Sequence, residues 1–204
     1  MVEMKVNSDS EASNCLMDRL QGATSCSSRY EVLDHALRYL PSQGLICEFG
    51  VFEGESINHI ARQVPHRSVF GFDSFEGLPE YWRPAFEPGA FSTGGCLPRV
   101  QPNVTLFKGW FATTLPRFAV EHSGPVAFLH IDCDLYSSTK CILEHLGSRL
   151  VPGSVVVFDE FFNYPGWEEH EFRAFSEFAA ARCLRHEYLA YNSQHEQVAM
   201  RVTA

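Results

Sequence analysis

Short apolar runs alternate with longer amphipathic stretches along most of this 204-residue chain. A short apolar run between polar residues is typical of a buried strand, whereas apolar positions three and four apart are typical of one face of a helix. The pattern predicts strands at residues 45–50, 68–72, 104–107, 126–129 and 154–158. Helical patterns separate most of them, and the clearest one, at 167–182, carries several phenylalanines along its core face.

Two more strands are expected near the C-terminus, at residues 184–191 and 197–202, with a hairpin-like connection between them. Strands that alternate with helices form mostly parallel sheets with helices on both faces. We read the chain as five such alternations followed by the hairpin. The expected fold is therefore α/β, a doubly wound, mostly parallel seven-stranded sheet with a C-terminal antiparallel hairpin.

The N-terminal residues 1–26 are polar and show no sustained period. They predict a flexible tail, with a short docking helix around residues 15–17 as the alternative. Ser28 and Glu31 have the spacing of a capping box, which predicts the start of a helix that Pro41 ends. A single domain is expected over residues 27–204.

A long irregular segment at about residues 76–102 interrupts the alternation and is rich in proline and glycine. Loops of this length inside a domain are often functional lids or disordered insertions. The segment also carries Tyr81, Trp82, Phe86 and Phe91, and disordered segments are poor in aromatic residues. It is therefore expected to be a lid, or else a loop whose aromatic residues pin it to the core.

Composition narrows the class of protein. The net charge of −9 without a basic cluster argues against a nucleic-acid partner. No apolar run approaches the roughly 20 residues of a membrane span, and no secretory signal is evident. The seven cysteines include no C-x-x-C pair and fit reduced thiols. These features predict a cytoplasmic protein that does not bind a membrane, and a homo-oligomer is compatible with them.

Four carboxylates follow two of the expected strands. Asp132 and Asp134 come after the run at 126–129, and Asp159 with Glu160 after the run at 154–158. Side chains two apart on an extended chain leave on the same face, and open α/β sheets bind ligands at the carboxyl ends of their strands. Crowded like charges predict a metal site or an acid/base site. The simpler alternative is that each aspartate caps a helix or forms a turn.

The turn after the first strand carries Glu48, Gly50, Gly54 and Ser56. Its glycines allow close approach of a nucleotide-like ligand to the backbone and to the next helix N-terminus. The dinucleotide fingerprint G-x-G-x-x-G is absent. Asp73 ends the second strand about 25 positions after Glu48, where it could accept both hydroxyls of a ribose. This spacing is similar to that of class I S-adenosylmethionine-dependent methyltransferases.

Three ordered motifs make the resemblance more specific. They are Gly71-Phe72-Asp73-Ser74-Phe75-Glu76-Gly77-Leu78-Pro79-Glu80 with Trp82, His130-Ile131-Asp132-Cys133-Asp134-Leu135-Tyr136-Ser137-Ser138-Thr139, and Phe158-Asp159-Glu160. Over roughly residues 44–180 the chain resembles the macrocin O-methyltransferase family. That resemblance implies a Rossmann-like class I methyltransferase fold and methyl transfer from S-adenosylmethionine to a hydroxyl, typically on an antibiotic deoxysugar, with a magnesium ion.

The resemblance also implies roles for single residues. Asp132, Asp159 and Glu160 would bind Mg²⁺ or another hard divalent cation, and Asp134 would act as the base. The expected cofactor contacts are Glu48, Gly50, Gly54 and Ser56 around the methionine part, Asp73 at the ribose, Ser74, Gly109 and Trp110 near the adenine, and Asp132. Family members often carry two aspartates where this chain has Asp159 and Glu160, and their N-terminal regions are longer.

Two other functions are left open. Asp132-Cys133-Asp134 is also the D-x-D motif of metal-dependent nucleotide-sugar glycosyltransferases. A non-catalytic cofactor-binding protein would keep the same turn. The favoured expectation is an O-methyltransferase whose acceptor is a small molecule, a sugar or a glycoside.

Overall fold

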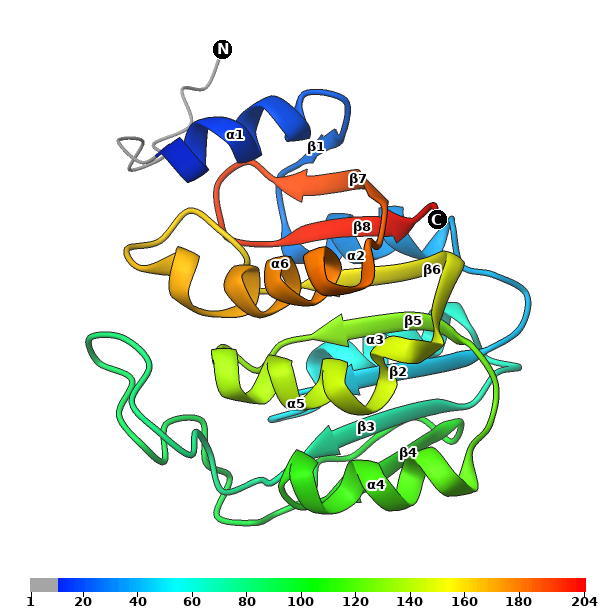
Figure 1. Ribbon diagram of the computed structural model, residues 1–204. Coiled ribbons are helices and arrows are strands. Elements are labelled where there is room, and N and C mark those ends of the chain that lie inside the picture. The colour runs from blue at the N-terminus through cyan, green and yellow to red at the C-terminus, as the bar shows by residue number, and fades with distance from the viewer. Residues whose placement is uncertain (1–10) are drawn as a thin grey trace.

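The computed structural model describes residues 11–204 as one eight-stranded sheet with helices on both of its faces (Figure 1). The strands are β1 (Thr24–Cys26), β2 (Leu45–Phe49), β3 (Val69–Asp73), β4 (Val104–Lys108), β5 (Val126–Ile131), β6 (Leu150–Phe158), β7 (His186–Asn192) and β8 (Val198–Val202). The helices are α1 (Glu11–Leu20), α2 (Arg29–Leu37), α3 (Glu55–Gln63), α4 (Phe111–Glu121), α5 (Tyr136–Leu146) and α6 (Glu171–Arg182), with short 3₁₀ turns at Gly147–Arg149 and Trp167–Glu169. Residues 1–10, which make up part of the expected tail, lie outside the described residues.

The strand order β1-β7-β8-β6-β5-β2-β3-β4 confirms the expected doubly wound, mostly parallel sheet. β8 runs antiparallel to β6 and β7, whereas the other neighbouring strands pair in parallel. The expected count of seven strands was wrong, because β1 adds an eighth beside β7. With three residues, β1 is too short to show a periodic pattern in the sequence.

Two layers of helices bury the two faces of the sheet. Helices α4, α5 and α6 cover the face nearer the viewer in Figure 1, and α2 and α3 lie behind it. All residues of the central strands β2 and β5 are buried. Parallel strands covered on both faces read as continuous apolar runs, which is why these two were visible in the sequence. The carboxyl ends of β2, β3, β5 and β6 open toward the same side of the molecule.

Residues 11–26 form α1 and β1, which corrects the expectation of a flexible tail over residues 1–26. Helix α1 lies on β7, and its Leu16 and Leu20 are buried in the core on that side. The guanidinium of Arg19 lies 5.2 Å from the ring centre of Tyr188. The alternative of a short docking helix describes this segment better, because its apolar side chains find a surface on the sheet.

The cap of helix α2 forms where the sequence places it. The Ser28 hydroxyl accepts a hydrogen bond from the Glu31 amide at 3.2 Å, and the Glu31 carboxylate accepts from the Ser27 amide at 2.8 Å. These bonds satisfy N–H groups that a helix start leaves without partners. They make Arg29 the first residue of the helix, beside the carboxyl ends of β5 and β6.

The loop at 76–102 contains no helix or strand, and its aromatic residues behave in two ways. Trp82 is buried, and the Arg83 guanidinium lies 3.8 Å from the centre of its ring. Arg83 also holds Glu196 of the β7–β8 connection through two contacts of 2.9 and 3.2 Å. Tyr81 and Phe91 remain exposed. One end of the loop is therefore pinned to the core, and the role of a lid stays a prediction.

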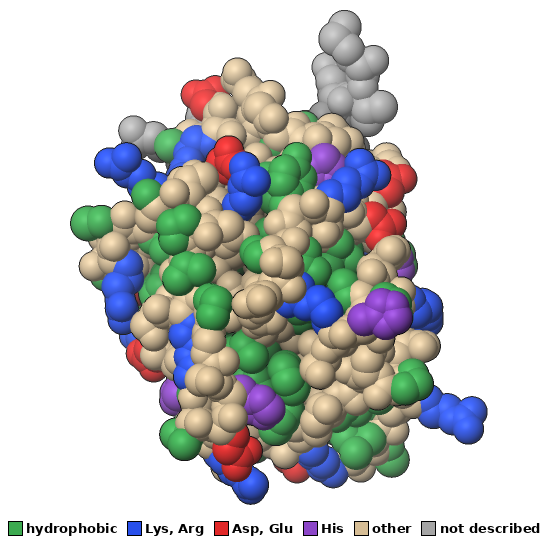
Figure 2. Space-filling model, turned by 90° about the vertical axis from the view of Figure 1, so that its right-hand side faces the viewer, with side chains coloured by type: hydrophobic (Ala, Val, Ile, Leu, Met, Phe, Trp, Pro, Cys, Tyr) green, Lys and Arg blue, Asp and Glu red, His purple; other side chains and the backbone are tan. Residues whose placement is uncertain are grey.

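The face at the amino ends of the parallel strands mixes charges of both signs. Figure 2 shows basic and acidic side chains there interspersed with hydrophobic and other ones. Within residues 11–204, no helix has the length and apolar content that are needed to cross a membrane.

The docking of α1 makes a testable prediction. Leu20 is 1% exposed, so Leu20→Ala should lower the free energy of unfolding by about 2–5 kcal/mol through loss of burial and a residual cavity. The matched control is Leu97→Ala, since Leu97 is 55% exposed and its loss should change stability by no more than about 0.5 kcal/mol. Urea unfolding measures both, and equal effects would mean that α1 is not part of the folded domain.

Candidate functional site

A cavity of about 510 Å³ lies at the carboxyl ends of the central parallel strands. Its walls come from the turns that follow β2, β3, β4, β5 and β6, with Phe91 of the loop at 76–102 and Arg29 of α2. Ligands of open α/β sheets bind in this place because the connections there diverge to opposite faces of the sheet. The cavity is therefore the candidate site.

The topology brings the four carboxylates of Asp132, Asp134, Asp159 and Glu160 into this one cavity. Strand β5 ends at Ile131, although the Asp132 amide still donates to the Phe49 carbonyl of β2 at 2.8 Å, so Asp132 continues the pairing and Asp134 lies beyond it. Asp134 takes a left-handed conformation with φ of +64°, which is uncommon for a residue with a side chain. The extended chain thus ends before Asp134, and both aspartates line the cavity.

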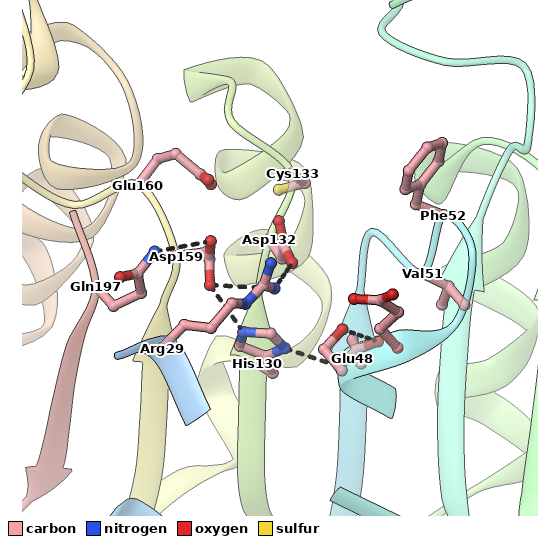
Figure 3. Close-up of polar contacts among 12 residues, drawn as sticks. Arg29, Glu48, Val51, Phe52, His130, Asp132, Cys133, Asp159, Glu160 and Gln197 are labelled. Atoms are coloured by element: carbon pink, nitrogen blue, oxygen red, sulfur yellow. Dashed lines mark hydrogen bonds and ion pairs between the residues drawn. The ribbon is translucent and has the colours of Figure 1, made fainter. Parts of the chain in front are cut away.

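Two cationic side chains hold the centre of this acidic cluster (Figure 3). The Arg29 Nη2 lies 2.7 Å from Oδ2 of Asp132 and 3.3 Å from Oδ1 of Asp159. His130 is buried below them, with Nδ1 2.7 Å from the Glu48 carboxylate and Nε2 3.6 Å from Asp159. The roles of Arg29 and His130 were missed in the sequence. Asp159 is thus flanked by two cations.

These contacts separate the acidities of the carboxyl groups. Burial would raise the pKa of Asp159, but contact with His130 and the charge of Arg29 bring it down to about 2. Burial and the neighbouring Asp159 raise the pKa of Asp132 to about 7. Burial, followed by the charges of its aspartate neighbours, raises the pKa of Asp134 well above its ordinary value. Burial alone would lower the pKa of His130, yet its carboxylate neighbours raise it to about 10.

The donor atoms of the cluster fit a divalent cation. Asp132 and Asp159 each offer a carboxylate oxygen, and these atoms lie within 4.8 Å of each other and of a ring nitrogen of His130, whose raised pKa makes it a neighbouring cation and not a ligand. Among the described residues, Oε2 of Glu160 is buried without a hydrogen-bond partner, and Oδ1 of Asp159 has only its ion contacts with Arg29 and His130. Carboxylate oxygens are ligands that hard cations prefer. Glu160 lies outside the group of three, so its place as a ligand stays a prediction.

Glu171, a buried residue of α6, connects the ends of β5 and β6 through its carboxylate. Glu171 accepts hydrogen bonds from the amides of Cys133, at 3.4 Å, and Glu160, at 3.2 Å. Gln197 of the β7–β8 connection donates to Oδ2 of Asp159 at 3.0 Å. These supports come from elements distant in sequence, and no motif indicated them.

The glycine turn after β2 is built around two contacts with its neighbours. A Cβ atom at Gly50, whose φ is +90°, would lie 1.6 Å from the carbonyl oxygen of Asp132. Only glycine fits here, because the backbone after β5 crosses the turn at this point. The amides of Val51 and Phe52 both donate to Oδ2 of Asp73 at 2.8 Å. Asp73 therefore ties the turn after β2 to the end of β3.

The other expected cofactor residues divide into two groups. Those that line the cavity are Gly50, Ser56, Asp73, Ser74, Gly109, Trp110 and Asp132. Gly54 caps α3 with φ of +83° beside them. Glu48 is fully buried, and its carboxylate accepts from the Ser56 hydroxyl at 3.1 Å and pairs with His130. In this structure Glu48 supports the cavity from below, and its contact with a cofactor stays a prediction.

Comparison with known proteins places this geometry in a family. Residues 47–161, from β2 to just beyond β6, match a family model described as a methyltransferase domain. The chain belongs to the methyltransferase-domain family. The match covers the glycine turn, Asp73 and all four carboxylates of the cluster.

The similar proteins include methyltransferases of sugars. The chain is 34% identical to 8-demethyl-8-(2,3-dimethoxy-alpha-L-rhamnosyl)-tetracenomycin-C 4′-O-methyltransferase of Streptomyces olivaceus. The aligned region is 141 residues long and covers 58% of this chain. The chain spans about half of that relative, 53% of its length. The fold of the present chain is similar to that of the calicheamicin methyltransferase CalS11, with a TM-score of 0.69 and 22% sequence identity. The alignment covers 98% of this chain and 96% of CalS11. A ligand-free CalS11 structure, described as a TDP-rhamnose 3′-O-methyltransferase, has a TM-score of 0.61, 25% identity, and 95% and 88% coverage.

In this methyltransferase domain, Asp73 can be tested apart from any ligand. Its carboxylate accepts the two amides of the glycine turn, and Oδ1 also accepts from the Phe75 amide at 2.7 Å. Asp73→Ala should therefore lower the free energy of unfolding of the cofactor-free protein by roughly 1–3 kcal/mol. Glu53→Ala removes the same charge from the same cavity and serves as the control. If Asp73→Ala weakened cofactor binding without any loss of stability, Asp73 would act on the ribose alone.

Proposed function

We propose that this chain is an S-adenosylmethionine-dependent O-methyltransferase that acts on a hydroxyl of a sugar or a glycosylated natural product and uses a hard divalent cation. One observation carries the proposal: the four carboxylates line the same cavity as the glycine turn and Asp73. A donor site and a proton-accepting site thus share one space. The methyltransferase-domain match favours methyl transfer over the glycosyl transfer that the D-x-D motif leaves open.

The charge of the cavity supports the choice of cofactor. Seven of the side chains that line it are Asp or Glu, and Arg29 is the one Lys or Arg among the described lining residues. S-adenosylmethionine carries a positive sulfonium, which an acidic cavity attracts. The turn between β2 and α3, with Asp73 beside it, would hold its methionine and ribose parts, and Ser74, Gly109 and Trp110 would lie near the adenine.

The residues of the cluster divide the chemistry between them. A sugar hydroxyl is about as weak an acid as water, whose pKa is about 15.7. A carboxylate of ordinary pKa, about 4, therefore removes its proton poorly. A hard cation, when bound, supplies Lewis acidity that makes the hydroxyl more acidic. Asp132 and Asp159 would hold that cation with Glu160 as the third ligand. Asp134, which lines the cavity and is buried, would take the proton.

The rim of the cavity supports a glycoside as acceptor. Phe52 and Phe91 line the cavity and are 40% and 42% exposed. Phe52 and Phe91 pack edge to face at 5.9 Å, which joins the glycine turn to the loop at 76–102. Exposed rings at a cavity mouth offer an apolar surface to a flat aglycone. Because the acidic lining of the cavity disfavours a phosphate-bearing acceptor, we favour a neutral glycoside over a sugar nucleotide.

Binding and turnover test the function. Calorimetry should detect S-adenosylmethionine binding, and methyl transfer from a labelled cofactor should appear with rhamnosides of aromatic aglycones before it appears with TDP-rhamnose. Asp134→Asn, which keeps the size of the side chain, should retain cofactor binding and lose about 10²–10⁴-fold in turnover if Asp134 is the base. Binding of sugar nucleotides without S-adenosylmethionine binding would overturn the proposal, and cofactor binding with no acceptor would favour a non-catalytic protein.

The metal part of the function has its own test. Chelation should abolish turnover and Mg²⁺ should restore it, because the divalent cation that Asp132 and Asp159 would hold is expected to activate the hydroxyl. Asp132→Ala and Asp159→Ala should lose metal binding measured by calorimetry. Glu53→Ala, a change of equal charge at the rim, should keep it. Full activity in chelator would remove the cation from the mechanism and leave Asp134 as the base.

A further inference from the structure

The guanidinium of Arg29 lies between the two strand ends of the cavity. Its Nη2 contacts both carboxylates that are expected to hold a metal, at 2.7 Å for Asp132 and 3.3 Å for Asp159. Arg29 comes from α2, 103 residues before Asp132 and 130 before Asp159. The capped start of α2 holds its backbone in place, so the contact is built into the fold.

A guanidinium in this position and a divalent cation exclude each other. The ligand atoms of Asp132 and Asp159 belong to a group within 4.8 Å of one another, and Nη2 of Arg29 reaches both aspartates. Magnesium needs oxygen ligands at about 2.0–2.1 Å, so it would occupy the same space between the two carboxylates. Two positive charges at contact distance also repel.

Arg29 has room to leave this position. Its side chain lines the cavity and is 36% exposed, whereas the Asp159 side chain beneath it is 6% exposed. Nε of Arg29 has no hydrogen-bond partner among the described residues, so the guanidinium is held through one end only. Asp159 is also held by Gln197 at 3.0 Å, and the Arg29 side chain is more exposed than either aspartate, so the arginine is the movable member.

We propose that Arg29 is a built-in counter-cation that competes with the divalent metal for Asp132 and Asp159. Without metal it balances the buried carboxylates, and metal entry displaces it into the cavity. The inference rests on the metal part of the proposed function. Arg29 would then be a positioning residue that lowers metal affinity. Its removal should strengthen metal binding, whereas removal of a residue that supports the metal should weaken it.

Metal affinity in the absence of cofactor and acceptor tests the competition. Mn²⁺ binding is measured by calorimetry for the wild type, for Arg29→Met, which keeps the length and removes the charge, and for Arg29→Lys, which keeps the charge. Arg29→Met should bind Mn²⁺ tighter by roughly tenfold or more, because a competing charge at contact distance is gone. Arg29→Lys should stay closer to the wild type. Arg83→Met, which breaks the ion pair with Glu196, is the control and should leave metal affinity unchanged.

Removal of Arg29 also leaves buried carboxylates unbalanced, so a second measurement uses the wild type alone. The ¹⁵N resonances of the Arg29 guanidinium should move to the position of a free side chain when Mg²⁺ saturates the site. Weaker Mn²⁺ binding by Arg29→Met, or guanidinium resonances that do not move at saturation, would overturn the competition while the metal site stands. Absence of metal binding in both wild type and Arg29→Met would instead remove the metal from the proposed function, and S-adenosylmethionine binding would still be tested separately.

Discussion

Mutual repulsion of carboxylates at the ends of β5 and β6 is the constraint around which this cavity is built. Parallel strands place Asp132, Asp134, Asp159 and Glu160 in one cavity, and burial removes the water that would screen them. Buried like charges are tolerated only when opposite charges or protons balance them. His130 below and Arg29 above supply that balance for Asp159, and the raised pKa values of Asp132 and Asp134 show what remains unbalanced.

Elements far apart in the sequence converge on this balance. The cap at Ser28 starts α2 where Arg29 reaches the cluster, and Glu171 at the start of α6 holds the amides that follow both strands. Gly50 lets the backbone after β2 pass the carbonyl of Asp132. The same turn is tied to Asp73, so the glycine turn and the acidic side of the cavity are structurally connected. A substitution in the glycine turn should therefore also affect the acidic cluster, and the reverse.

The sequence predicted the sheet, its hairpin and the grouping of the four acidic residues, because β2, β5 and β6 are long apolar runs and parallel topology aligns their carboxyl ends. It did not predict β1, whose three residues carry no period, and it offered the docking helix α1 only as the alternative to a flexible tail. Nor did it assign Arg29 or His130, since a pair such as Arg29 with Asp132 spans 103 positions and leaves no local pattern. Gly50 was read as making room for a ligand, whereas it also makes room for backbone.

The proposed function places a cation between Asp132 and Asp159, beside the turn that would hold the methyl donor. Anomalous diffraction from a crystal soaked with Mn²⁺ and S-adenosylhomocysteine tests this most directly. The account predicts a manganese peak bound by both carboxylates, the nucleoside against Asp73, and the guanidinium of Arg29 withdrawn into the cavity. A nucleoside in place with no manganese peak, and Arg29 still paired with both aspartates, would contradict it.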